Sequence, residues 1–391
     1  MSIIRRILGE QRALGPSQWL TDQPMTSTAG VQINSQTALS IGSYYSAVKL
    51  YSDTVASLSW DTFIRIDGTR RPYRPSPSWI SMPQPSNPNF TAFDLKHRMV
   101  SSLLIFGNCF VLFIRGRNGD IVEMRVLDPQ KVEIRMVNGS PIYTVTGDDN
   151  VGVELTSDAI LHIPLFATGS ALRAPSPVEQ HQTTLGLASA TQLYSSRFYQ
   201  QGASPSAVIK IPGELTQDQA ESLRNSFSRR HEGIEKMHKI AVLTGGADFQ
   251  QMSMKISDMQ LVETMHWSVE SIARLMGVPL QLLQYPEATS YASSEVLMQA
   301  WLRLGLGPLV TRLEAGLQRL VPGADQTFIK FNIDSLLRPT TIDRMTAYRV
   351  QLETGIRSLN EVRRLEDLSD IDGGDEHWKP LNIGVVGQEP K

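Results

Sequence analysis

Between residues 257 and 276, apolar side chains recur at alternating intervals of three and four residues. This spacing predicts a helix with an apolar stripe along one face and a polar face elsewhere. Gly277 ends the helix, and Pro279 prevents its continuation. The apolar positions are Val262, Met265, Val269, Ile272 and Met276, and the second face carries Glu263, Trp267, Glu270 and Arg274.

A second long helix is predicted earlier in the chain, over residues 177–201. Its apolar positions share one face, Ser176 is a suitable N-cap, and Gly202 stops it. Residues 203–255 then contain a strand, a helix with capping-box spacing and a strand pair around a Gly245-Gly246 turn. This order predicts a compact insertion between the two long helices.

From residue 278 to residue 293 the pattern is irregular and contains prolines at 279 and 286. A helical pattern returns from about Ser294 to Leu320, interrupted by two glycines and Pro308. Because a proline inside a helix removes a hydrogen bond and clashes with the preceding turn, we expect a kink caused by Pro308. A strand begins at Thr327, and helices follow at 340–353 and after a capping box of Ser358 and Glu361.

The N-terminal half alternates helices with short strands. Helices are predicted at 43–60 and 91–107, and strand pairs are expected at Asp67-Gly68, Asn118-Gly119 and Asn138-Gly139, which are typical two-residue turns. The first 38 residues are rich in small and polar types, so we expect a short helix at 2–13 and then an extended arm. That arm is either poorly packed or reaches a neighbouring subunit. The predicted fold class is α+β.

Length and charge narrow the possibilities. A chain of 391 residues is too long for one small core and predicts two to three structural units. The formal net charge of −2 excludes a protein that binds nucleic acid through an overall basic surface, so any contact with DNA must be local. Cys109 is the single cysteine, which excludes an internal disulfide, and we expect it to be a buried apolar group.

Motifs of common enzyme classes are missing from the sequence. It has no GxxxxGK[ST] phosphate loop and no GxSxG elbow. His231 and Glu232 begin a pair like that of zinc proteases, but the next histidine is His238, so a helix cannot aim both at one metal ion. An acidic turn at 370–376 could hold a hard cation, although its glycines favour a solvated turn. We expect no metal, no cofactor and no enzymatic activity.

An ordered series of segments resembles the portal proteins of tailed bacteriophages. The segment DMQLVETMHWSVESIARLMGVP is followed by a polar loop and then by GPLVTRLEAGL, as in the core of those proteins. Before them come YSAVKLYSDTVASL, NPNFTAF, LLIFGNCFVLFIRGRNGDI and PSPVE, and after them NEVRRLE and a GGD turn. The resemblance spans roughly residues 40–385.

The resemblance implies a portal fold with an α/β wing, a two-helix stem, a small α/β clip and a C-terminal helical crown. The implied division of the chain is an N-terminal arm at 1–38, the wing at 39–175, the first stem helix at 176–202, the clip at 203–255, the second stem helix at 256–277, a tunnel loop at 278–293, a long kinked helix with a returning wing strand at 294–335, and the crown and tail at 336–391.

The resemblance also implies a function. Portal proteins form a ring, usually of twelve subunits, at one capsid vertex, through which double-stranded DNA is packaged, retained and ejected without sequence specificity. The implied partners are the terminase packaging ATPase, the major capsid and scaffold proteins, and the head-completion adaptor proteins. The implied location is the virion, after synthesis in the bacterial host cytoplasm.

Three groups of candidate site residues follow from the resemblance. Glu263, Glu270 and Arg274 would line the channel wall, where negative charge lets DNA slide because like charge repels phosphate. A tunnel loop would contact the DNA backbone through Gln281, Gln284, Tyr285, Glu287, Thr289 and Tyr291. A basic run in the clip would dock a partner through Arg229, Arg230, His231, Lys236, His238 and Lys239.

Other interpretations remain open at this point. Met265 and Trp267 either pack against another helix of the same fold or belong to a surface used in the ring. The basic run of the clip could be a solvated helix end. A soluble enzyme with an unrecognised site would need a pocket near His162, His181 and His266. A membrane-associated protein would use the helix that carries Arg5 and Arg12.

Overall fold

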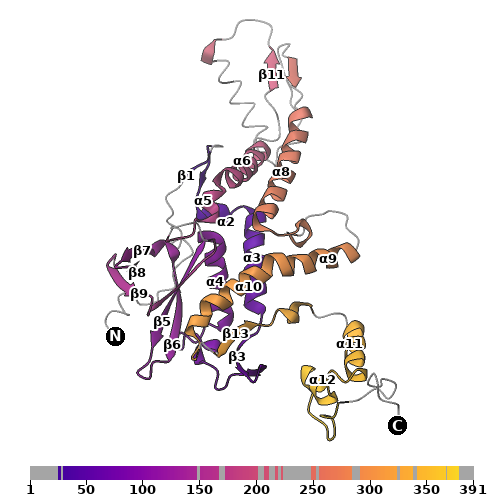
Figure 1. Ribbon diagram of the computed structural model, residues 1–391. Coiled ribbons are helices and arrows are strands. Elements are labelled where there is room, and N and C mark those ends of the chain that lie inside the picture. Colours follow the sequence, from indigo (N-terminus) through magenta and orange to yellow (C-terminus); the bar gives the residue numbers. More distant parts are fainter. Residues whose placement is uncertain are drawn as a thin grey trace. The chain divides into compact units, whose positions relative to one another are not determined.

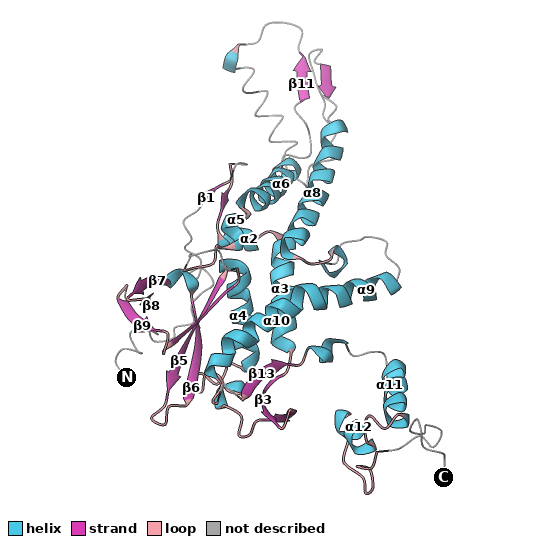
Figure 2. Cartoon of the chain, viewed as in Figure 1, coloured by secondary structure: helices cyan, strands magenta, loops and turns pink. Residues whose placement is uncertain are grey.

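The fold is described from a computed structural model, in which two units can be distinguished, Met1–Phe331 and Asn332–Lys391. Helices and strands are mixed in the first unit, while the described elements of the second are helical, so the α+β prediction is confirmed (Figure 2). The described residues are 25–27, 30–147, 150–166, 172–200, 207–210, 216–218, 222, 248–251, 255–283, 291–323, 326–337, 341–366 and 368–377.

Two neighbouring helices, α3 (Gly42–Ser57) and α4 (Ala92–Phe106), lie in the middle of the first unit (Figure 1). Their facing sides bury large side chains such as Tyr44 and Leu103, and the Tyr44 hydroxyl donates to the Leu104 carbonyl oxygen. The expected capping box is present, with the Thr91 hydroxyl accepting from the Asp94 backbone and the Asp94 carboxylate from that of Thr91. Helix α3 ends three residues earlier than predicted, because Trp60 already belongs to a strand.

Three small antiparallel sheets surround this helix pair, and the predicted hairpins at residues 67–68, 118–119 and 138–139 all form. One sheet has the order β10-β5-β6, the second β7-β8-β9 and the third β13-β3-β4. In the third sheet β13, from late in the chain, pairs with β3, so two segments far apart in the sequence lie side by side. The bounds are β3 Trp60–Ile66, β4 Thr69–Pro72, β5 Asn108–Arg115, β6 Ile121–Leu127, β7 Val132–Val137, β8 Ser140–Thr146, β9 Gly152–Thr156, β10 Ile160–Pro164 and β13 Thr327–Phe331.

A polar network joins the corner between α4 and β5 to the segment that leads into the long helices. Gly107 adopts a left-handed conformation with φ of +71°, and a Cβ there would lie 2.3 Å from the Pro175 carbonyl oxygen. Buried Asn108 donates to the Phe106 and Ala174 carbonyl oxygens and accepts from the Ala174 backbone N–H. His162 Nε2 lies 3.0 Å from Asn108 Oδ1. Because that oxygen is an acceptor, Nε2 carries a proton. Burial lowers the pKa of His162 to about 4, so the imidazole is neutral near pH 7.

Long helices extend from this body on one side (Figure 1). The helix expected at 177–201 is divided at His181 into α5 (Pro177–Gln180), capped by Ser176, and α6 (Gln182–Gln200). Strands β11 (Ala207–Lys210) and β12 (Asp248–Gln251) form at positions where strands were expected, and they pair with each other in the insertion. The first strand of the pair predicted around Gly245-Gly246 lies outside the described residues. Helix α8 (Lys255–Met276) then returns to the body.

The described part of the N-terminal arm packs on its own chain. Strands β1 (Met25–Thr26) and β2 (Gln32–Ile33) form a hairpin, followed by α2 (Ser35–Leu39). A Cβ at Gly186 of α6 would lie 2.4 Å from the Ser27 side chain, so hairpin and helix touch closely. The expectation of an extended, poorly packed arm is therefore wrong for these residues, whereas the helix expected at 2–13 lies outside the described residues.

The kinked helix forms with a different local structure from the one expected. Helix α9 (Tyr291–Trp301) passes into a π-helical turn, Leu302–Leu306, and then into α10 (Gly307–Leu317). The Gly307 N–H donates to the Leu302 carbonyl oxygen, five residues back. Pro308 is the second residue of α10, and Leu306 and Gly307 before it are already helical, so the helix continues through this region and the interruption is a π turn that directly precedes the proline.

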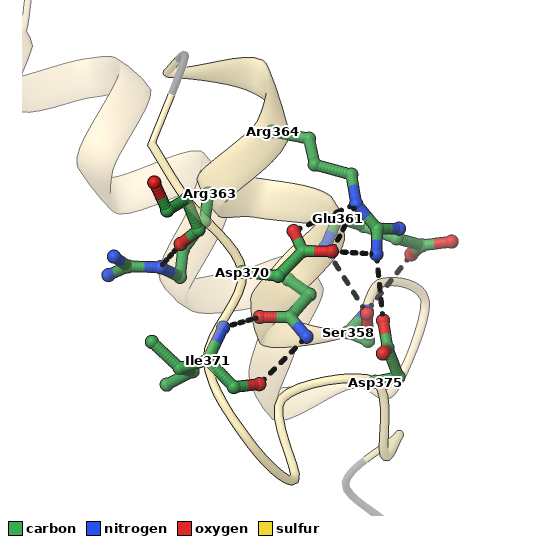
Figure 3. Close-up of polar contacts among 9 residues, drawn as sticks. Ser358, Glu361, Arg363, Arg364, Asp370, Ile371 and Asp375 are labelled. Carbon is green, nitrogen blue, oxygen red and sulfur yellow. Dashed lines mark hydrogen bonds and ion pairs between the residues drawn. The ribbon is translucent and has the colours of Figure 1, made fainter.

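The second unit contains α11 (Thr341–Glu353) and α12 (Leu359–Leu365), with the expected Ser358–Glu361 capping box. Helix α12 is tied to the turn that follows it (Figure 3). The Arg364 guanidinium donates to the Asp370 carboxylate and lies 3.2 Å from that of Asp375. The bond from Arg364 lowers the pKa of Asp370. Asn360 bonds to the Ile371 backbone. Two carboxylates of the acidic turn, Asp370 and Asp375, thus share one arginine, and no group able to hold a metal ion occurs among the described residues.

We predict that Gly107→Ala lowers the free energy of unfolding by about 3 kcal/mol or more, since a left-handed backbone and a steric clash both oppose the methyl group. Gly119→Ala is the matched control. Its φ of +86° is equally unfavourable, but nothing lies within 4 Å of the added Cβ. The free energy of unfolding of Gly119→Ala should therefore fall by only about 1 kcal/mol. Urea unfolding of both variants measures the difference, and equal losses would contradict the close approach at Pro175.

We also predict that His162 makes stability depend on pH. Burial lowers the pKa of His162 from 6.5 to about 4, so the unfolded chain binds a proton in a pH range where the folded chain does not. Stability from this group is complete above pH 6.5 and is lost as the pH falls toward 4, by at most about 1.4 kcal/mol per pH unit.

Substitution His162→Gln should flatten the unfolding free energy over that range, measured by urea titrations at several pH values. His181→Gln, at an exposed position, should leave the wild-type pH dependence in place. A wild-type slope retained in His162→Gln would contradict the assignment.

Candidate functional site

Helices α6 and α8 pack along each other and provide the surface on which the channel residues were predicted (Figure 1). Ser195 Oγ lies 3.7 Å from Met265 Sδ at this contact. The hydroxyl groups of Thr191, Ser195 and Ser268 bond to carbonyl oxygens four residues back in their own helices. Their hydrogen bonds are therefore satisfied within each helix, and the small side chains allow the helices to approach closely.

The apolar stripe predicted on α8 is only partly correct. Ile272 is fully buried, but Met265 is 39% exposed, and three small residues, Ser268, Ser271 and Ala273, are buried instead of larger ones. Close packing favours small residues at a contact, whereas the periodicity argument counts only large apolar ones. Trp267 is 48% exposed, so it is not a buried core residue, whereas Met265 does contact Ser195 of α6.

The polar face of α8 has the composition that the sequence predicted. Glu263 and Arg274 are exposed and Glu270 is half-buried, and these positions share one side of the helix with Trp267. Within the described residues, neither glutamate forms an ion pair with a lysine or arginine. The face therefore presents two carboxylates, a guanidinium and an indole to its surroundings.

The C-terminal end of α8 is fixed by Tyr51 of α3. The Tyr51 hydroxyl donates within 3.1 Å of the Met276 carbonyl oxygen and 3.3 Å of that of Gly277. Its ring lies 5.2 Å from the Trp301 ring, and a Cβ at Gly305 would come within 2.7 Å of its oxygen. The end of α8 and the π turn, on either side of the irregular segment, therefore both contact the Tyr51 side chain. Burial raises the pKa of Tyr51.

The structure describes two of the six predicted loop residues. Gln281 is half-buried in a 3-10 turn, Leu280–Leu283. Tyr291 is the first residue of α9, so the helix begins three residues earlier than the sequence suggested and this tyrosine is helical. The loop residues Gln284, Tyr285, Glu287 and Thr289, and the clip residues Arg229, Arg230, His231, Lys236, His238 and Lys239, lie outside the described residues.

The histidines considered for an enzyme do not form a site. His162 stacks on Phe110 with ring centroids 4.5 Å apart and contacts Asn108, which accounts for its burial. His181 is exposed at the end of α5, and His266 is exposed on α8. Cys109 is fully buried, as predicted, and burial raises the pKa of its thiol.

A cavity of about 250 Å³ lies beside Tyr51, but it has no catalytic character. Its lining is mostly aliphatic, and its one charged residue, Arg312, donates to the Pro164 carbonyl oxygen. Among the described helices, none combines the length and apolarity needed to cross a bilayer. The Arg5–Arg12 segment considered for membrane contact lies outside the described residues.

Sequence reasoning missed exposed apolar residues on the long helices. Leu193 of α6 is 45% exposed, and Leu304 in the π turn is 80% exposed. Their spacing marks them as members of apolar helix faces, and nothing in one sequence distinguishes a face that packs internally from a face that is left exposed.

Comparison with known proteins identifies relatives of the whole chain. A model of the family "Phage portal protein" matches residues 43–367. The probable portal protein of Streptomyces phage phiC31 is 32% identical over 381 residues, which cover 93% of this chain and 83% of that protein. A solved virion of a native gene transfer agent particle contains a similar chain, with a TM-score of 0.61, 22% identity, and coverage of 86% of this chain and 94% of that one.

A neck structure of the native gene transfer agent particle, computed with C12 symmetry, also has the same fold. Its chain aligns with a TM-score of 0.58 and 22% identity, over 89% of this chain and 96% of that one.

Proposed function

Because the chain belongs to the phage portal protein family, we propose that it assembles into a closed ring of usually twelve copies at one vertex of a capsid. Double-stranded DNA passes through the ring during packaging and ejection, without sequence specificity. The C12 symmetry of the similar neck structure supports the number of copies.

The observation that carries this proposal is the apolar surface exposed on the paired helices α6 and α8. Leu193 on one helix and Met265 on the other are 45% and 39% exposed in the single chain. Large apolar side chains left exposed on two neighbouring helices can bind other proteins. In a ring each subunit has two neighbours, so the α6 surface of one copy can cover the α8 surface of the next in one repeated contact.

The second unit supports association as well. None of its described apolar side chains is buried, whereas Ile342, Ile356 and Leu368 are 77%, 68% and 51% exposed. Helix α11 turns Arg344 and Tyr348 toward Glu366 beside α12, which leaves its opposite face, with Ile342 and Val350, uncovered. A unit without a core of its own needs a partner surface for stability, and neighbouring copies of a ring provide one.

The polar face of α8 is proposed to form the channel wall. Glu263 and Glu270 repel the phosphates of DNA, and Arg274 adds a single attractive charge. A wall of this composition keeps DNA from adhering while it moves. The loop after α8, with Gln281, Gln284, Tyr285, Glu287, Thr289 and the nearby Tyr291, is proposed to touch the backbone through mostly uncharged groups.

The remaining parts receive roles by the same proposal. We assign to the arm, wing, stem, clip and crown the boundaries that the resemblance implied. The clip docks the terminase ATPase through its basic run and later the head-completion proteins, and the wing and crown contact the major capsid and scaffold proteins. The protein is made in the cytoplasm of the bacterial host and has no bond-making chemistry of its own.

We predict that Leu193→Glu and Met265→Glu convert the ring into smaller species, because each places a charge in an apolar contact between copies. Light scattering of the purified protein measures the mass. Met136→Glu, at a site that is 50% exposed on β7 outside the paired helices, is the control and should leave the ring intact. Rings of unchanged mass in both helix variants would refute the contact between α6 and α8.

We further predict that the double variant Glu263→Lys and Glu270→Lys assembles normally but translocates DNA more slowly. A positive wall attracts phosphate, and each close charge pair adds to the adhesion that DNA must break as it moves. A packaging assay with purified terminase measures the rate. Glu133→Lys on the exposed part of β7 should have no effect, and an unchanged rate in the double variant would place these glutamates outside the channel.

A further inference from the structure

Two arginines and two phenylalanines form a stack on the sheet β13-β3-β4. Phe63 and Phe328 are directly opposite in register, and their rings lie 5.9 Å apart at an angle of 29°. The guanidinium carbon of Arg70 lies 3.6 Å from the centre of the Phe63 ring, and that of Arg65 lies 5.4 Å from the centre of the Phe328 ring. One guanidinium group therefore packs over each phenylalanine ring. We call these four residues the arginine–phenylalanine stack.

The stack lies on the outer face of its sheet. Side chains alternate between the two faces of a strand, and Thr62, Ile329 and Phe331, at alternate positions to the stack, are buried toward the core. Arg65 and Arg70 are exposed and the two rings are half-buried. The rings thus act as a fixed platform that orients the guanidinium groups toward solvent.

The two charges of the stack are not balanced within the described residues. Arg65 and Arg70 are direct partners in the β3–β4 register, and like charges at such positions repel. Of the carboxylates close to the stack in the sheet, Asp61 accepts from Arg74 at 2.6 Å and 3.0 Å. Asp67 lies in the β3–β4 turn between the two arginines and forms no ion pair with either of them in the described structure. No ion pair with a described carboxylate involves Arg65 or Arg70. An anion bound between them would remove the repulsion.

We propose that the arginine–phenylalanine stack binds the phosphate backbone of double-stranded DNA on the capsid side of the ring. A guanidinium group held by its face on a ring presents its N–H edge, which fits a phosphate. The surface has no arrangement for reading bases, so the contact is independent of sequence. A patch of two arginines also agrees with a chain whose net charge is −2, since the attraction needs only to be local.

The place of the stack in the fold favours DNA over a protein as the ligand. Strands β3 and β13 lie at the end of the first unit that is remote from the free ends of α6 and α8 (Figure 1). Under the proposed function, on which this step rests, those helices lead to the clip outside the particle, so the opposite end of the wing faces the capsid interior, where the packaged genome lies. The contacts of the wing with capsid and scaffold proteins then belong to its other surfaces. Ring symmetry repeats the stack around the axis, and weak single contacts then add up along one polyanion.

The test compares rings of the full chain with and without the stack charges. A 40-base-pair duplex of arbitrary sequence is titrated into the protein by fluorescence anisotropy at several salt concentrations. Because each lost phosphate contact reduces the slope of log K against log salt by about 0.9, Arg65→Gln with Arg70→Gln should make the slope shallower by about 2 for each stack that contacts the duplex, and weaken binding about tenfold or more near 0.1 M salt.

Two control variants make the result specific. Arg135→Gln removes an exposed arginine that pairs with Glu154 on another sheet, and it should change neither affinity nor slope. Arg65→Lys with Arg70→Lys keeps the charge but loses the planar contact with the rings, so it should keep the slope and lose part of the affinity. Full affinity in the lysine variant would overturn the role of the rings.

The mass of every variant is measured on the same samples. The inference would be overturned if the double glutamine variant formed intact rings and bound the duplex like wild type. It would also be overturned if that variant bound the duplex normally but failed in capsid assembly, which would indicate an acidic protein ligand. A wild-type protein that forms no rings under any condition counts against the proposed function instead.

Discussion

The hydroxyl group of Tyr51 is the point on which the arrangement of the first unit depends. It bonds to the last carbonyl oxygens of α8 while its ring packs on Trp301, and Gly305 leaves the space that it needs. Helix α3, the end of α8 and the π turn therefore meet at one side chain. A long helix that extends from a body has little to fix its direction except contacts at its base. The hydrogen bonds of the Tyr51 hydroxyl provide such a contact for α8.

Most local structure could be predicted from the sequence, because it depends on residues close together in the chain. The capping boxes at Thr91 and Ser358 and the hairpin turns form as their residues dictate. The fold class also followed, since periods of two and of three to four residues alternate along the chain. At Gly107 the sequence indicated a helix end, but the close approach of Pro175 could not be foreseen, as it joins residues far apart in the chain.

The features that were missed depend on tertiary contacts. Periodicity placed Met265 on a buried face, although Ser268 and Ala273 are among the buried residues of α8. Pro308 suggested a proline kink, whereas the approach of Tyr51 to Gly305 accompanies a π turn ahead of it. The arginine–phenylalanine stack needs β13 to pair with β3, across more than half of the chain. The prediction that these residues share one polar face of α8 was correct, because the geometry of a single helix determines which residues share a face.

The central claim is that this chain closes into a ring by covering the apolar surfaces of its long helices with neighbouring copies. The most direct measurement is the mass of the purified protein in solution by light scattering, combined with images of single particles. Twelve copies of the 43.5 kDa chain give a mass of about 520 kDa, seen as rings with a central hole. A species that remains a monomer or dimer at high concentration and in the presence of capsid and scaffold proteins would contradict the account.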